Sequence, residues 1–87
     1  MANSKLTNKK KAKAKEVILL ANRIKELRLK SGYTNYEFFA YDNNLPRAQY
    51  GRYEKGEDLR FTSLMRVIKT FGITPKEFFS KGFDELK

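Results

Sequence analysis

The segment from residue 34 to residue 56 constrains the fold of this chain more than any other. Its sequence, TNYEFFAYDNNLPRAQYGRYEKG, favours two short helices with a tight Asn-Asn turn between them. Asn43 and Asn44 suit that turn because Asn adopts a positive φ more easily than most residues that carry a side chain. We predict the first helix over about residues 35–42 and the second over about residues 46–54.

The first of these helices has a start signal and an apolar face. Thr34 and Glu37 have the spacing of a capping box, in which each side chain accepts a hydrogen bond from a backbone NH of the first turn. Asp42 and the two Asn residues that follow it end the helix. We expect the inner face to consist of Phe38 or Phe39, Ala40 and Tyr41.

The second helix separates bulky aromatic side chains from basic ones. Pro46 suits its first turn, where the missing NH is not needed. Tyr50 and Tyr53 lie three residues apart and are expected to face inward. The opposite face then carries Arg47, Ala48, Gly51 and Arg52.

Three further helices flank this pair. Apolar residues at three- and four-residue spacing predict a helix over about residues 16–30 and another after Thr62, ended by Gly32 and Gly72. Their stripes are Val17, Leu20, Ile24 and Leu27 in one helix, and Leu64, Val67, Ile68 and Phe71 in the other.

A short fifth helix follows a strong start signal. Thr74 and Glu77 have capping-box spacing, and Pro75 fits the first helical position. The predicted helix contains Phe78 and Phe79 and ends at Gly82.

The chain thus divides into an arm, one domain and a short tail, residues 83–87. Residues 16–82 are expected to form an all-α, compact five-helix bundle, because no segment alternates with the period of two that strands require. Residues 1–15 hold six of the 19 basic side chains and no acid, which leaves 13 basic against 10 acidic ones elsewhere and a net charge of +9 overall. We expect a mobile, disordered arm that either aids solubility or follows phosphates. Its candidate lysines are Lys9, Lys10, Lys11 and Lys13.

The composition argues against several classes of function. There is no Cys for a disulfide or thiolate site and no His, the commonest general base and metal ligand. No glycine loop suits a phosphate, and no nucleophile lies beside a base. We therefore expect no enzyme activity, metal, cofactor or small-molecule ligand. No apolar run approaches a membrane span and no signal peptide is visible, so we expect no membrane partner and a cytoplasmic, nucleoid-associated location.

Several residues at fixed spacing resemble a known family. A small Ala40, a turn residue Asn44, a core residue Tyr50 and the Glu-Lys-Gly of residues 54–56 are similar to the pattern of the lambda repressor-like (Xre family, Cro/CI-type) helix-turn-helix domain. The resemblance covers about residues 17–80 and implies a five-helix fold. It also implies a partly buried ion pair between Arg28 and Glu54.

The sequence departs from the family at three points. Asn44 stands where Gly is usual at the turn. Asn35 and Tyr36 stand where a Gln is common at the entry to the first helix of the pair. Leu45 and Pro46 replace the usual polar cap of the second helix.

The resemblance implies binding of double-stranded DNA by the second helix of the pair, placed in the major groove. Arg47 matches a position that touches base edges, and an Arg there can bind O6 and N7 of guanine in a bidentate way. Arg52 would read a second base or hold a phosphate, Ala48 would contact a thymine methyl group, and Gln49 lies nearer the flank. Gly51 permits either close approach to DNA or close packing between helices.

The rim of this helix pair is expected to bind the DNA backbone. The loop acids Glu57 and Asp58 would repel phosphates, so we expect this loop to aim them away. The expected phosphate contacts are the backbone amides of Asn35 and Tyr36 and the side chains of Lys55 and Arg60.

The expected function is sequence-specific binding of double-stranded DNA by a transcriptional regulator of bacterial or phage type. We expect a homodimer, with Phe79, Phe83 and Leu86 as the contact surface. Alternatives are an antitoxin-like or accessory protein-interaction module, and association with RNA or the ribosome through the lysine arm. The aromatic residues could also stack single-stranded bases, but their helical spacing favours a core. They are Phe38, Phe39, Tyr41, Tyr50, Tyr53, Phe61, Phe71, Phe78 and Phe79.

Overall fold

The computed structural model describes residues 13–86, and within that range it contains helices and no strand. The predicted all-α fold of five helices is therefore confirmed. Most of the predicted arm lies outside the described residues, including Lys9, Lys10 and Lys11. The helices are α1 (Lys15–Lys30), α2 (Tyr36–Asp42), α3 (Arg47–Glu54), α4 (Phe61–Thr70) and α5 (Pro75–Phe78).

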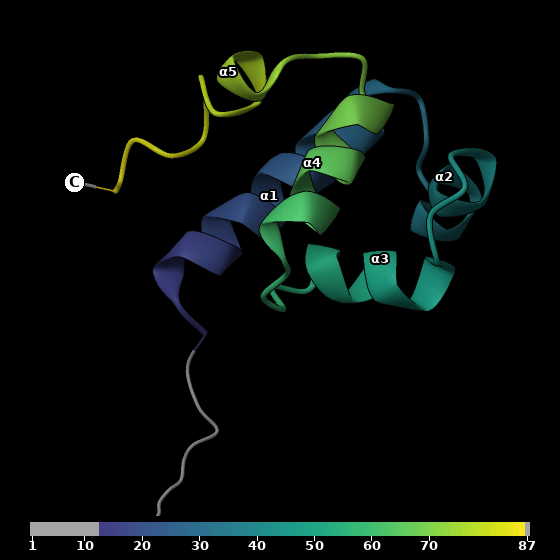
Figure 1. The fold of residues 1–87 in the computed structure, drawn as a ribbon, viewed down its shortest axis with the longest axis horizontal. Coiled ribbons are helices and arrows are strands. Elements are labelled where there is room, and N and C mark those ends of the chain that lie inside the picture. The colour runs from purple at the N-terminus through teal and green to yellow at the C-terminus, as the bar shows by residue number, and fades with distance from the viewer. Residues whose placement is uncertain (1–12, 87) are drawn as a thin grey trace, which may run out of the picture.

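The two longest helices, α1 and α4, form the centre of the bundle (Figure 1). The helix pair α2 and α3 lies on one side of them, and α5 with the C-terminal segment lies on the other (Figure 1). Helix α3 contacts both α2 and α1, whereas α5 contacts α4. The helix pair that the sequence singles out thus lies across α1 and α4 from the C-terminal segment.

Aromatic side chains of α2 and α3 join the core of the bundle. The ring of Phe39 is stacked on that of Phe71, with centroids 5.3 Å apart, and lies 5.2 Å from that of Tyr50. Each fully buried aromatic ring removes a large apolar area from water, so these contacts hold the pair on the bundle. The buried core consists of Ile24, Phe39, Ala40, Leu45, Tyr50, Tyr53, Leu64, Val67, Ile68 and Phe78.

Four residues of the predicted aromatic core are instead exposed. Phe38, Tyr41 and Phe61 are 67%, 71% and 71% exposed, and Phe79 is also on the surface. Phe38 and Tyr41 lie three residues apart and so share one face of α2, while Phe39 and Ala40 occupy the buried face. Seven residues of helix have only one face to bury, and the prediction that Tyr41 faces inward is wrong.

The starts of α2 and α3 differ by one residue from the prediction, and that of α4 differs by two. Asn35, and not Thr34, caps α2: its Oδ1 accepts hydrogen bonds from the amides of Glu37 (2.7 Å) and Phe38 (3.1 Å). Asn is among the best capping residues, so it displaces the predicted Thr34 box. Pro46 is the N-cap of α3, and α4 begins already at Phe61. The capping box at Thr74 and Glu77 is confirmed, with Phe79 just beyond α5.

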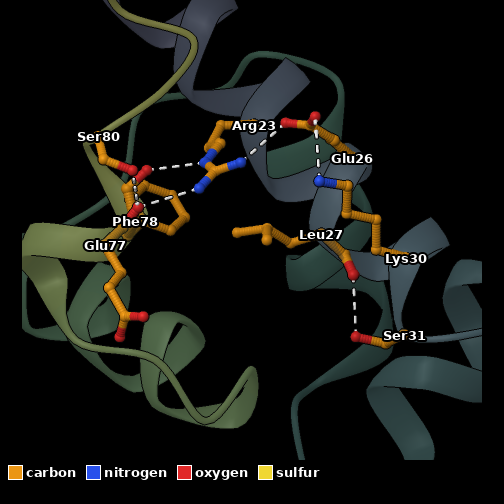
Figure 2. A network of polar contacts seen from close by, with 8 residues as sticks. All are labelled: Arg23, Glu26, Leu27, Lys30, Ser31, Glu77, Phe78 and Ser80. Atoms are coloured by element: carbon orange, nitrogen blue, oxygen red, sulfur yellow. Dashed lines mark hydrogen bonds and ion pairs between the residues drawn. The ribbon is translucent and has the colours of Figure 1, made fainter.

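Arg23 fastens α5 to α1, a role that the sequence did not predict (Figure 2). Its side chain is buried, and it donates from Nε to the carbonyl of Phe78 (2.7 Å) and from Nη2 to the carbonyl of Glu77 (3.0 Å). Its Nη1 donates to Glu26 at 2.9 Å. The guanidinium therefore satisfies carbonyls at the end of a four-residue helix that could not be stable alone.

Candidate nucleic-acid interface

The turn between α2 and α3 is set by one residue of positive φ. Asn44 has φ 58°, and the next amide, that of Leu45, donates to the carbonyl of Ala40 at 2.8 Å. This is the geometry of a left-handed helix C-cap, where Gly is usual and Asn is tolerated. Leu45 is buried directly after the turn, so the start of α3 is anchored in the core.

Close packing between α2 and α3 explains Gly51. The residue is buried, and a Cβ atom added there would lie 2.7 Å from Cε1 of Tyr36. Of the two explanations for this glycine, helix packing holds and close approach to DNA does not. Tyr36 is half-buried, and its ring lies against Gly51. Gly51 therefore does not share the exposed face of α3 on which it was expected.

The exposed side of α3 carries Arg47, Ala48 and Arg52, while Tyr50 and Tyr53 are buried. Gln49 is half-buried and lines a polar hollow of about 420 Å³ between α3 and α4. Arg47, Ala48 and Arg52 are thus exposed to solvent, and Arg52 lines the same hollow as Gln49.

The C-terminus of α3 ends in a Schellman motif. Gly56 has φ 90°, its amide donates to the carbonyl of Tyr53 (3.2 Å), and the amide of Glu57 donates to the carbonyl of Arg52 (3.1 Å). A Cβ atom on Gly56 would lie 3.0 Å from Cδ of Lys13. The described end of the lysine arm therefore lies against the end of α3.

The loop after α3 holds two exposed cations and two acids. Lys55 is the C-cap of α3 and Arg60 is the N-cap of α4, and both are exposed. Asp58 accepts a hydrogen bond from the amide of Leu59 at 2.8 Å, whereas Oε1 of Glu57 lies 3.0 Å from Nε of Arg52. Glu57 therefore lies beside a candidate base-reading residue, and the expectation that the loop aims its acids away from phosphates stays a prediction.

A buried ion pair joins the end of α1 to the end of α3. Arg28 donates from Nε to Oε2 and from Nη2 to Oε1 of Glu54, each at 2.8 Å, and from Nη1 to the carbonyl of Tyr33 at 2.9 Å. The hydrogen bonds to Glu54 raise the pKa of Arg28. This is the pair that the family resemblance implies, and it holds the end of α3 against the end of α1.

The hydroxyl of Tyr50 is buried close to this pair. It has no hydrogen-bond partner among the described residues. Burial raises the pKa of Tyr50, with the carboxylate of Glu54 as the second cause, so the phenol stays neutral.

These features define a helix-turn-helix DNA-binding domain, and comparison with known families agrees. The helix-turn-helix family matches residues 24–78, more than half of the chain, and the chain belongs to this lambda repressor-like family of DNA-binding domains. No curated protein and no solved structure matches the chain. None of the helices in residues 13–86 is long and apolar enough to cross a membrane.

Proposed function

We propose that the protein is a regulator of transcription, of bacterial or phage type, that binds specific sequences of double-stranded DNA on the nucleoid. Helix α3 enters the major groove, as the second helix of such a pair does. The observation that carries this proposal is the exposed side of α3, where Arg47, Ala48 and Arg52 face solvent on a helix anchored by two buried tyrosines.

Arg47 is the first base-reading residue of the proposal. It is the first residue of α3, is exposed, and forms no ion pair with any residue in the described range. Its guanidinium is free to bind guanine O6 and N7. Ala48 adds a methyl group for contact with thymine, and Gln49 contacts only the flank.

Phosphate contacts surround the recognition helix. At the start of α2, the side chain of Asn35 caps the amides of Glu37 and Phe38. The preceding amides, those of Asn35 and Tyr36, bind one phosphate of the DNA. Lys55 at the C-terminus of α3 and Arg60 at the start of α4 bind phosphates of the DNA backbone. The contact of Lys13 with Gly56 supports a path for the arm along the DNA, because the arm leaves the fold at this helix end.

A homodimer completes the proposal. An apolar hollow of about 360 Å³ lies between the start of α1, the start of α4 and the C-terminal segment. Its lining includes Phe61, Phe79, Phe83 and Leu86, and all of these except Phe83 are exposed. A second copy would bury this surface and leave α3 free, because α5 and the C-terminal segment lie across the bundle from α2 and α3 (Figure 1).

Selection of bound sequences from random duplex DNA tests the function. We expect enrichment of a short motif with guanine at the position of Arg47, and an inverted repeat if the dimer binds. Recovery of no motif, together with a stable complex with another protein, would contradict DNA reading and favour the antitoxin-like or accessory role.

A further inference from the structure

The two exposed arginines of α3 have different surroundings. Arg47 stands alone at the start of the helix, whereas Arg52 lies beside Glu57, with Nε and Oε1 3.0 Å apart. The contact places the carboxylate at the Nε edge of the guanidinium, which has five N–H donors in all. Both side chains remain about half exposed, at 51% and 59%.

The cap of α3 builds this contact. In a Schellman motif the third residue from the helix end and the second residue after the C-cap lie side by side, and they often make an apolar contact. Arg52 and Glu57 occupy these two positions, since the amide of Glu57 donates to the carbonyl of Arg52. The backbone that ends α3 thus delivers a carboxylate to the guanidinium of Arg52.

The ion pair is not needed for the fold. Half-exposed ion pairs add little to stability because water screens the charges and two long side chains lose freedom. The cap itself is formed by backbone hydrogen bonds and by Gly56 with its positive φ. We therefore expect Glu57 to affect the contact of Arg52 with DNA more than the stability of the fold.

We propose that Glu57 is a positioning residue that directs Arg52 to a base edge and away from phosphates. The inference rests on the proposed function. Arg52 was expected either to read a second base or to hold a phosphate, and the inference assigns it the first role. A phosphate that approaches Arg52 also meets the negative charge of Glu57, which cancels most of the attraction. Guanine O6 and N7 carry no net charge, and a guanidinium has five N–H donors, more than one carboxylate can occupy, so donors remain for the base edge. Glu57 thus penalises non-specific binding more than specific binding.

The test compares the Glu57→Gln variant with wild type on two DNA duplexes, one selected by the wild-type protein and one random. We expect the variant to bind random duplex roughly fivefold more tightly, the effect of removing one unit charge at about 4 Å in water. Its salt slope on random duplex should steepen by about 0.9, the value for one more neutralised phosphate. The selected duplex should gain less, so the ratio of specific to random affinity falls.

Asp58→Asn is the matched control. It removes one negative charge from the neighbouring residue, whose carboxylate is bonded to the amide of Leu59. The control should raise both affinities by a similar factor and leave their ratio unchanged. In an Arg52→Met background, Glu57→Gln should also leave the ratio unchanged, because the group it positions is gone.

Three results would overturn the inference: an unchanged ratio in Glu57→Gln, an equal fall in Asp58→Asn, or a fall that persists without Arg52. Each of these leaves the proposed function intact if the wild-type protein selects a motif. A wild-type protein that selects no motif refutes the proposed function, and the role of Glu57 with it. Melting temperatures of all variants are measured first, and we expect them to stay near wild type because the pair is half exposed.

Discussion

Arg28 and Glu54 are joined by two hydrogen bonds of 2.8 Å, although they lie 26 residues apart in the chain. Both side chains are more than nine-tenths buried. Arg28 also binds the carbonyl of Tyr33, so one guanidinium connects α1, the segment before α2 and α3. The end of α3 is thus held by a charge pair that is buried from water.

The first prediction concerns this pair. Glu54→Ala leaves the guanidinium of Arg28 buried without its carboxylate, which should lower the free energy of unfolding by on the order of 3–5 kcal/mol. Thermal or urea unfolding measures the loss. Tyr50→Phe is the control, because the Tyr50 hydroxyl is buried beside the pair without a partner and its removal should change stability little. An unchanged melting temperature in Glu54→Ala would contradict a structural role for the pair.

The second prediction concerns the contact of Arg23 with α5 (Figure 2). Arg23→Met keeps much of the buried aliphatic volume but strands the carbonyl of Phe78, whereas that of Glu77 keeps its hydrogen bonds from Ser80. We expect a loss of about 1–3 kcal/mol for the stranded carbonyl. Hydrogen exchange should show the amides of Phe78 and Phe79 losing protection before those of α3. Lys25→Met, an exposed change on the same helix, is the control and should leave both measurements unchanged.

The third prediction concerns the packing of α2 on α3. A Cβ atom at Gly51 meets the ring of Tyr36, so the effects of Gly51→Ala and Tyr36→Ala should not add. We expect a coupling free energy of about 0.5–3 kcal/mol in a double-mutant cycle, with Gly51→Ala more favourable once the ring is absent. Alanine in place of glycine would itself favour the helix by roughly 1 kcal/mol. Additive effects would mean that the two residues do not limit the approach of the helices.

The fourth prediction separates the role proposed for the arm from that proposed for α3. Deletion of residues 1–12 removes Lys5, Lys9, Lys10 and Lys11. Binding to every duplex should weaken alike, and the salt slope should flatten by about 0.9 for each phosphate that the arm no longer neutralises. Fluorescence anisotropy at several salt concentrations measures both. An unchanged slope would reduce the arm to an aid to solubility, and complete loss of binding with Arg47→Ala harmless would favour recognition of RNA by the arm.

Local signals predicted much of the fold. The Asn-Asn turn, the capping box before α5 and the apolar stripes of α1 and α4 each act within a few residues. The structure contains them, except that Val17 of the α1 stripe lines the apolar hollow and not the core. Choices between neighbouring residues were harder, because Thr34 and Asn35 both cap helices well and Phe38 and Phe39 are equally apolar. Only packing against distant rings, those of Tyr50 and Phe71, decides that Phe39 and not Phe38 turns inward.

Interactions between distant segments had no local signal. Arg23 looks like any polar residue on α1, because its partners are backbone carbonyls 54 and 55 residues away. The pairing of Arg52 with Glu57 was missed for another reason. Both residues belong to the C-terminal cap of α3. Gly56 signals a Schellman motif there, and that motif places Arg52 and Glu57 side by side.

Base reading by α3 is the central claim, and Arg47→Ala tests it most directly. The affinities of the variant and the wild type are measured on the selected duplex, on duplexes altered at single base pairs, and on random duplex. We predict a loss of about 1–3 kcal/mol on the selected duplex, relaxed preference at one or two base pairs, and little change on random duplex. An equal loss on selected and random duplexes would contradict a base-reading role for Arg47.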